Sequence, residues 1–355
     1  MKLPLFALCL GLFLPAAFRS ACADTYVRFN TSLGYIDVDL FSNATPNTVA
    51  NFLSYVDSGA YANSIIHRSV PGFVIQGGGY FISDNTVNAI PAGAPVASEA
   101  GISNTRGTIA MALTANSTTG VTDPNSGTNE WFFNEVDNNS STAPANLDAE
   151  GFTVFGTIMN ANGLSVMDQI NSEPTYDASS LFGSAFTQLP LINYNSTVGL
   201  ELQNFISIYS ITLLTVQDFA TWQSANFTTQ QQGNPAYSGP NATPLNDGVP
   251  NLFKYLFDIN PTVPMAAADR AKLPAVGTTT IGGTPYMTLT YNQCTALVGV
   301  TVNVQTSPDL QNWTTVTNPT FVQTGSNSTT GDPIIQVQVP VTGAKQFIRL
   351  NVTQS

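Results

Sequence analysis

The chain has 355 residues, a length that suits two domains better than one. Hydrophobic residues make up 43% of it and charged residues only 9%, so a core can form while Asn, Thr, Ser and Gln supply most of the surface polarity. The formal net charge of −12 argues against nucleic acid or an anionic membrane as a partner, because both require clustered Lys and Arg.

Residues 1–23 have the pattern of an export signal. Lys2 gives a short positive start, residues 3–18 are apolar, and the small residues around Ala23 form a cleavage signal before Asp24. The apolar run is too short for a comfortable membrane span. We therefore expect an exported protein, periplasmic or extracellular, that begins at Asp24.

The cysteines leave one alternative open and exclude other sites. A lipoprotein acylated on Cys22 is the alternative, although Arg19 stands where such signals carry Leu. Cleavage after residue 23 removes Cys9 and Cys22, so Cys294 becomes the only thiol. An internal disulfide and a cysteine metal site are then both excluded.

The first predicted elements are a hairpin and a helix. Residues 26–30 and 35–41 form the two arms of the hairpin, and the second arm alternates apolar residues with Asp37 and Asp39, as in a half-buried strand. Thr45 and Pro46 then predict a helix start, with Thr as N-cap and Pro in the first turn. The apolar residues at helical spacing that follow, before a stop at Gly59, are Val49, Phe52, Leu53 and Val56.

A second helix and a closing strand complete the predicted N-terminal domain, residues 24–216. The helix is indicated by Leu164, Val166, Met167 and Ile170, and residues 205–216 read as the strand. Short strands and loops rich in Gly, Asn and Ser lie between the two helices. The fold class is therefore mainly β, and the pattern favours a closed antiparallel β-barrel capped by two helices.

Residues 217–270 form a predicted connector. Phe219, Ala220 and Trp222 indicate a short helix, and residues 245–255 resemble the Asp-rich calcium loops that precede helices in exported bacterial proteins. Calcium loops need a series of oxygen ligands that ends in a bidentate Glu.

The ligand set of this loop is incomplete. Only Asp247 and Asn251 offer suitable side chains, Thr243 and Leu245 occupy earlier ligand positions, and Lys254 stands where the bidentate Glu belongs. Because a cation in that position repels the metal ion, we expect a calcium-free connector and no metal site.

Residues 271–355 predict a small β-sandwich. Strand-like segments separated by turns rich in Gly, Asn and Ser occur at 287–291, 298–305, 333–339 and 346–352. Residues 307–313 resemble a turn of C-terminal β modules in exported bacterial proteins. The sequence indicates no partner for this module.

Five sequence blocks in the N-terminal domain form an ordered motif. They are Ile66-His67-Arg68-Ser69-Val70-Pro71-Gly72-Phe73-Val74-Ile75-Gln76-Gly77-Gly78, Gly107-Thr108-Ile109-Ala110-Met111-Ala112, Glu130-Trp131-Phe132-Phe133-Asn134, Leu147-Asp148 and Phe152-Thr153-Val154-Phe155-Gly156. In this order they resemble the cyclophilin family of peptidyl-prolyl cis–trans isomerases, and the resemblance covers residues 25–216. It implies the barrel fold, proline-containing polypeptides as substrates and no cofactor.

The chemistry of this family explains why no cofactor is expected. Rotation about an X–Pro bond breaks amide resonance, with a barrier of about 18–20 kcal/mol, but it makes and breaks no bond to carbon. A donor aimed at the prolyl nitrogen stabilises the twisted state more than the ground state, because the nitrogen gains a lone pair as it loses conjugation. A guanidinium group held by a neighbouring amide suits this task.

The resemblance assigns roles to ten residues. Arg68 corresponds to the catalytic arginine and Gln76 to the glutamine that orients it. The other eight are expected to bind substrate: Phe73, Val74, Phe132 and Leu147 in the proline pocket, Ala112 through its backbone, and Leu113, Glu130 and Phe152 beside them.

Several positions depart from the common pattern of the family. Glu130 replaces a Gln, which removes a donor to the substrate and brings a carboxylate near Arg68, and Leu113 replaces an Asn whose contact is made by the main chain. Asn146 and Phe152 stand where many eukaryotic members carry Trp and His. These changes concern the substrate range more than activity.

Three neighbouring residues have simpler interpretations. His67 is the only histidine, but rotation needs no base, so we expect a structural role for it. Trp131 and Phe133 alternate with Phe132 and are expected in the core.

Two alternative functions remain open from the sequence. In one, the protein binds proline segments without turnover, with Glu130 as the sign of lost catalysis. In the other, the C-terminal module attaches the protein to a cell surface or a polysaccharide. Retention of Arg68 and Gln76 together favours catalysis, because a pure binder does not need both.

Overall fold

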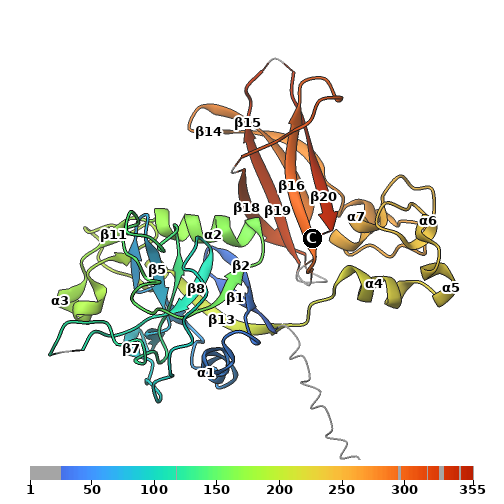
Figure 1. The fold of residues 1–355 in the computed structure, drawn as a ribbon. Helices are drawn as coiled ribbons and strands as arrows, with labels where there is room; N and C mark the ends of the chain where they lie inside the picture. Colours follow the sequence, from blue (N-terminus) through green and yellow to red (C-terminus); the bar gives the residue numbers. More distant parts are fainter. Residues whose placement is uncertain are drawn as a thin grey trace, which may run out of the picture.

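A computed structural model describes residues 25–116, 118–294, 297–317, 319–327, 332–343 and 345–354. The expected export signal and its cleavage site lie outside the described residues. Figure 1 shows a β-rich N-terminal part, a helical connector, and a C-terminal part whose strands stand above helix α2. No helix in the described ranges is long and apolar enough to cross a membrane.

The N-terminal part is built on one curled antiparallel sheet. Its strands are β1 Thr25–Thr31, β2 Gly34–Leu40, β3 Ser64–Ile65, β4 Arg68–Val70, β5 Val74–Gly77, β6 Tyr80–Ser83, β7 Thr86–Ala89, β8 Thr108–Met111, β9 Trp131–Asn134, β10 Val154–Ile158 and β13 Ser207–Leu214. They are ordered β4-β5-β9-β8-β10-β2-β1-β13-β3-β6-β7. The predicted hairpin β1–β2 and the predicted last strand β13, which pairs with β1, are both confirmed. Closure of this sheet into a barrel stays a prediction.

Aromatic rings fill the inside of this sheet. Phe29 of β1 packs edge-on against Trp131 and Phe133 of β9, with ring centroids 5.0 and 5.4 Å apart. Phe52 of the first helix closes the same cluster. Trp131 and Phe133 are therefore core residues, as predicted, and they leave Phe132 between them on the opposite face.

The two predicted helices are present as α1 Pro46–Asp57 and α2 Ala161–Ser172. Thr45 is the N-cap of α1, but its side chain makes no capping bond. The carboxylate of Glu99 replaces it, accepting hydrogen bonds from the N–H groups of Asn47 and Thr48 at 3.1 and 2.8 Å. Gly59, at φ +73°, follows the helix end in the left-handed conformation that such a stop requires.

Smaller elements cover one side of the sheet. They are β11 Thr175–Tyr176, α3 Ser179–Phe182, a 3₁₀ turn Ser184–Phe186, β12 Leu189–Pro190 and a 3₁₀ turn Leu202–Asn204. They pack around Phe186, which is fully buried.

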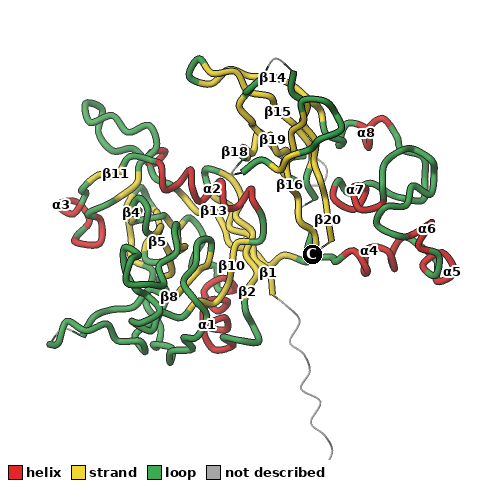
Figure 2. The backbone as a smooth tube through the Cα atoms, turned by 45° about the horizontal axis from the view of Figure 1, so that its top comes forward, coloured by secondary structure: helices red, strands yellow, loops and turns green. Residues whose placement is uncertain are grey.

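The connector is helical and has its own small core. Its helices are α4 Phe219–Asn226, α5 Thr229–Gln232, α6 Pro235–Ser238, α7 Asn251–Leu256 and α8 Ala267–Arg270. The predicted helix at 219 is α4, where Phe219 and Trp222 pack against Tyr255 of α7. Figures 1 and 2 place α4 to α7 beside β20, on the side of the C-terminal strands away from α2.

A lysine side chain fills the loop that resembles a calcium site. Lys254 is completely buried, and its Nζ lies 2.5 Å from Oδ2 of Asp247. Burial alone would raise the pKa of Asp247, but hydrogen bonds from Lys254 and from the N–H of Val249 outweigh it and lower that pKa. The ammonium group thus supplies the positive charge that a calcium ion supplies in a complete loop.

The C-terminal part consists of two sheets around one core. One sheet has the order β14-β15-β19-β18, and its strands are β14 Ala275–Ile281, β15 Thr284–Asn292, β19 Pro333–Pro340 and β18 Thr320–Ser326. The other sheet has the order β17-β16-β20, and its strands are β17 Thr314–Thr315, β16 Val300–Ser307 and β20 Phe347–Gln354. Leu289, Phe321 and Val337 of the first sheet share a buried cluster with Val304 and Leu350 of the second. The four predicted strands correspond to β15, β16, β19 and β20.

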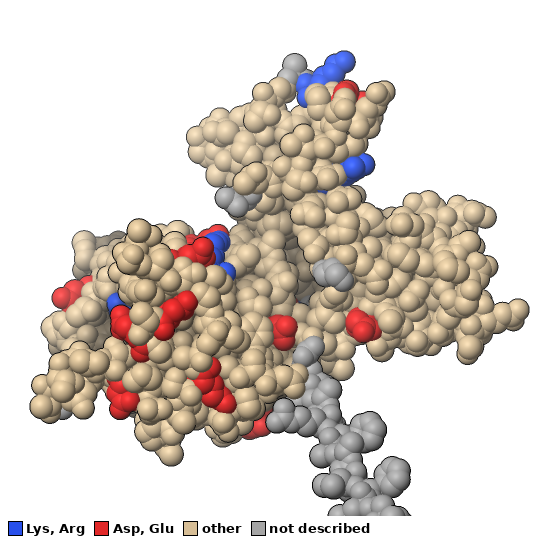
Figure 3. All heavy atoms as spheres, in the orientation of Figure 1, with Lys and Arg blue, Asp and Glu red and all other residues tan. Residues whose placement is uncertain are grey.

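Acidic side chains are spread over the N-terminal part on the face shown in Figure 3, with few basic ones among them. This face carries no basic patch of the kind that binds nucleic acid.

We predict that calcium does not stabilise this protein, because Lys254 already neutralises Asp247. Millimolar calcium should change the melting temperature by less than about 2 °C, since a ligand that does not bind the folded state cannot shift unfolding. Differential scanning fluorimetry with and without a chelator measures this. A rise of many degrees that the chelator reverses would contradict the prediction.

Candidate active site

Arg68 and Gln76 face each other across a tight hairpin. Arg68 is the first residue of β4 and is the cross-strand partner of Gln76 in β5. The turn between the strands contains Gly72, whose φ of +71° favours glycine. Nη1 of Arg68 donates a hydrogen bond to Oε1 of Gln76 at 3.3 Å. The structure therefore brings together the two residues predicted to act as a pair.

Glu130 fixes the orientation of the Gln76 amide. Nε2 of Gln76 donates to Oε2 of Glu130 at 2.7 Å. A carboxylate can only accept and a guanidinium can only donate, so the amide between them must point its NH₂ to Glu130 and its oxygen to Arg68. Flipping the amide would place a donor against a donor and an acceptor against an acceptor.

The carboxylate of Glu130 lies beside Gln76 and His67 rather than Arg68. Burial alone would raise the pKa of Glu130, but hydrogen bonding and charge attraction from His67, and then the bond from Gln76, outweigh it and lower that pKa. Among the described residues no ion pair involves Arg68. Burial lowers the pKa of Arg68 from its usual value, but a guanidinium remains charged in proteins.

His67 is part of the core, as expected. It is 1% exposed, and its ring packs edge-on against Tyr80 with centroids 5.0 Å apart. Its Nε2 lies 3.5 Å from Oε2 of Glu130, a contact that the sequence did not indicate. His67 thus supports the carboxylate that orients Gln76.

An apolar cluster separate from the main core collects the predicted proline-pocket residues. Val74, Phe132 and Leu147 are buried in it, and Phe73, Ala112 and Phe152 are partly buried against them. The rings of Phe132 and Phe152 meet edge to face, with centroids 5.6 Å apart. Because the cluster includes Val74 and Phe73 of the β4–β5 hairpin, it lies close to the Arg68–Gln76 pair.

Two predicted substrate contacts differ from the rest. The N–H of Ala112 donates to the carbonyl of Glu130 at 2.9 Å, so only the Ala112 carbonyl could pair with a substrate. Leu113 is half-buried and lies outside the apolar cluster, near Gly127. Its predicted contact with substrate, made through the main chain, stays a prediction.

A network of buried asparagines, which was not predicted from the sequence, lies behind the cluster. Nδ2 of Asn138 donates to Oδ1 of Asn134 at 2.9 Å and to the carbonyl of Phe73 at 3.1 Å, and Nδ2 of Asn134 donates to Oδ1 of Asn104 at 3.2 Å. The backbone N–H of Leu147 donates to the carbonyl of Asn138. The network thus fixes Phe73 and Leu147, which come from different loops. The signal in the sequence was a polar residue, Asn134, at the end of an aromatic strand.

Comparison with known proteins identifies the family. Residues 26–184 match the sequence model of a protein family, described as cyclophilin type peptidyl-prolyl cis-trans isomerase/CLD. The peptidyl-prolyl cis-trans isomerase of Acinetobacter baylyi is 40% identical over 157 residues, covering 44% of this chain and 76% of that protein. Isomerase A of Dickeya dadantii is 38% identical over 162 residues (44% and 76%), and isomerase B of Escherichia coli is 37% identical over 152 residues (42% and 85%).

The chain therefore belongs to the cyclophilin-type peptidyl-prolyl cis–trans isomerase family, as the motifs implied, and it is an isomerase of X–Pro bonds. The family match ends at residue 184, before the connector and the C-terminal sheets.

We predict that Asn138→Ala destabilises the protein by about 1–3 kcal/mol, because it leaves the buried Oδ1 of Asn134 without a donor and removes one of the two hydrogen bonds to the Phe73 carbonyl. Urea unfolding measures the change. The neighbouring Asn139→Ala is the control, since Asn139 is only half-buried and makes one side-chain bond, to Ser103. Equal effects of the two substitutions would show that the network does not support the cluster.

Proposed function

We propose that the protein accelerates rotation about X–Pro bonds by donating a hydrogen bond from Arg68 to the prolyl nitrogen. The observation that carries this proposal is the position of Arg68, tied to Gln76 beside the apolar cluster and paired with no carboxylate in the described chain. Its remaining N–H groups are then available to a substrate. Such a donor acts mainly in the twisted state, where the nitrogen lone pair is exposed.

Gln76 and Glu130 act in this mechanism as positioning residues. The guanidinium group is attached to a long, flexible side chain, so its direction must be fixed for the donor to reach the prolyl nitrogen. Oε1 of Gln76 supplies one anchor, and Glu130 prevents the amide from flipping. This role of Glu130 in orienting the Gln76 amide was not predicted from the sequence, where Glu130 only replaced a Gln.

The apolar cluster receives the proline ring. Phe73, Val74, Phe132, Leu147 and Phe152 offer aromatic and aliphatic surface. Excluding water from the twisting bond strengthens the hydrogen bond from Arg68. The Ala112 carbonyl is the backbone group left to pair with the substrate beside this ring.

The substrates we propose are exported polypeptides, in the periplasm or outside the cell. Support comes from the signal-like residues 1–23 and from a surface in which Asn, Thr, Ser and Gln replace charged residues. These two sequence features are independent of the residues proposed for catalysis. The location of the protein and its chemistry can therefore be tested separately.

We predict that activity depends on Arg68 far more than on the charge of Glu130. Arg68→Ala should lower kcat/KM by about two orders of magnitude, roughly 2.7 kcal/mol of transition-state stabilisation. Glu130→Gln should stay within several-fold of wild type, because a glutamine oxygen can still accept from Nε2 of Gln76. Protease-coupled isomerisation of an Ala-Pro tetrapeptide measures both.

Arg270→Ala is the matched control, since it removes an arginine of α8, which lies on the side of the C-terminal strands away from β4 and β5 (Figure 2). Circular dichroism and melting temperatures must match wild type for each variant. Full activity of Arg68→Ala would contradict the mechanism and favour a protein that binds proline segments without catalysis.

A further inference from the structure

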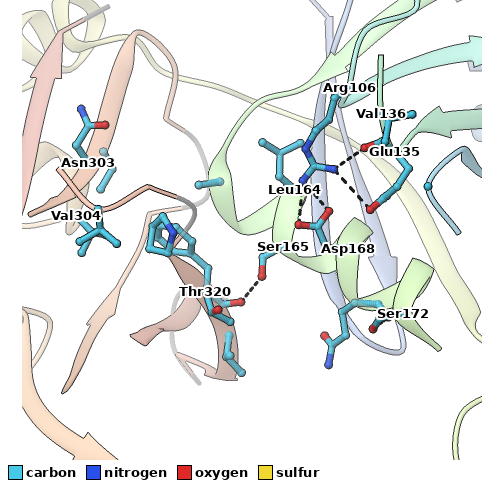
Figure 4. A pocket seen from close by; sticks show the side chains of 18 residues that line it. Arg106, Glu135, Val136, Leu164, Ser165, Asp168, Ser172, Asn303, Val304 and Thr320 are labelled. Atoms are coloured by element: carbon cyan, nitrogen blue, oxygen red, sulfur yellow. Dashed lines mark hydrogen bonds and ion pairs between the residues drawn. The ribbon is translucent and has the colours of Figure 1, made fainter. Parts of the chain in front are cut away.

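A cavity of about 880 Å³ is lined by residues of α2 and of the C-terminal strands β16 and β18 (Figure 4). Arg106, Glu135 and Asp168 line it on the N-terminal side, and Asn303 and Thr320 line it on the other. Its size suits several residues of a polypeptide, and clefts between domains are a common place for ligands.

Direct contacts between the N-terminal and the C-terminal part hold the walls of this cavity, called the groove below. Oγ of Ser165 in α2 donates to the carbonyl of Phe321 in β18 at 2.6 Å. Nearby, the N–H of Tyr35 donates to Oε1 of Gln323 at 3.3 Å. The groove is therefore a feature of the folded chain rather than a gap between two independent bodies.

Strand β16 presents a free backbone edge to the groove. On that side β17 pairs only with Gln305 and Thr306, and the N–H of Val316 bonds the carbonyl of Val304. Backbone groups alternate in direction along a strand, so the N–H and carbonyl of Val302 point to the same side as those of Val304. No described strand pairs with Val302 there. Such an edge can accept an extended peptide as an additional strand.

The opposite wall carries two acidic side chains, Glu135 and Asp168, and one arginine, Arg106. Nη2 of Arg106 bonds both carboxylate oxygens of Asp168, at 2.6 and 2.9 Å, and Nη1 lies 3.6 Å from Oε1 of Glu135. Oε2 of Glu135 is buried without a hydrogen-bond partner among the described residues. Burial, and then the charge of Asp168, raise the pKa of Glu135 to about 7. A Lys or Arg side chain in the groove would lower the pKa of Glu135 by charge attraction and favour its ionised form.

The groove adjoins the predicted proline pocket. Gly72 lines the groove, and the next residue, Phe73, belongs to the apolar cluster beside Arg68. The N–H of Gly72 donates to Oδ1 of Asn171 in α2 at 3.2 Å, which ties the hairpin turn to the same helix. Because an extended chain advances about 3.3 Å per residue, one segment of modest length can reach both places.

We propose that this groove is a second substrate site, which holds an extended segment bearing Lys or Arg by backbone pairing with β16 while a nearby X–Pro bond lies at Arg68. The inference rests on the proposed function for its substrate class. It gives the C-terminal sheets a role in binding the polypeptide that the N-terminal part isomerises.

The test compares a short and a long substrate on the full-length protein. The short one is an Ala-Pro tetrapeptide, and the long one is a labelled peptide of about fifteen residues, ~50 Å when extended, with one Ala-Pro bond and one Lys. Val302→Pro removes the N–H that faces the groove, whereas the control Val302→Thr keeps it with a similar shape. Thr320→Trp fills the groove from β18 at an exposed position whose side chain makes no hydrogen bond to another described residue.

For the long peptide, the KM of wild type and of Val302→Thr should be about tenfold lower than the KM of Val302→Pro and of Thr320→Trp. For the tetrapeptide, all four proteins should have the same kcat/KM. Replacing the Lys of the long peptide by Glu should remove most of the advantage. Unchanged KM values in both groove variants would overturn the proposal. If neither wild type nor any variant isomerises the tetrapeptide, the proposed catalytic mechanism is wrong. In that case fluorescence anisotropy of the labelled long peptide shows whether the groove binds it.

Discussion

The site depends on one side-chain amide held between a donor and an acceptor. Gln76 receives a hydrogen bond from Arg68 and gives one to Glu130, and each partner accepts only one orientation of the amide. The direction of the guanidinium group, and with it the donor that we propose for the prolyl nitrogen, follows from this arrangement. A carboxylate suits the outer position because it cannot itself act as a competing donor.

The fold serves this interaction by placing three strands side by side. β4, β5 and β9 are neighbours in the sheet, so Arg68, Gln76 and the residue just before β9, Glu130, come together although they are far apart in sequence. Behind them, Asn138 joins β9 to the loop of Phe73, and His67 supports Glu130 from the core. The chain of polar contacts from Arg68 through Gln76 and Glu130 therefore continues to His67, while the asparagine network supports Phe73 separately.

Local patterns predicted the elements and the paired site residues, but not the contacts between distant segments. Periodicity located α1, and motif order located Arg68 and Gln76. The acceptor of the first N–H groups of α1 is Glu99, some 52 positions away, and no local signal marks it. The mismatched loop predicted that Lys254 opposes calcium, yet not that its ammonium group would be buried against Asp247. The groove involves Gly72, α2 and β16, which only the three-dimensional arrangement brings together.

A double-mutant cycle on Gln76 and Glu130 tests the central claim most directly. The measured quantity is kcat/KM for the Ala-Pro tetrapeptide in Gln76→Ala, Glu130→Ala and the double variant, each checked for folding. If Glu130 acts through the amide of Gln76, the double variant should be no slower than Gln76→Ala alone. Losses that multiply would show that Glu130 acts on the substrate independently, and would contradict the account.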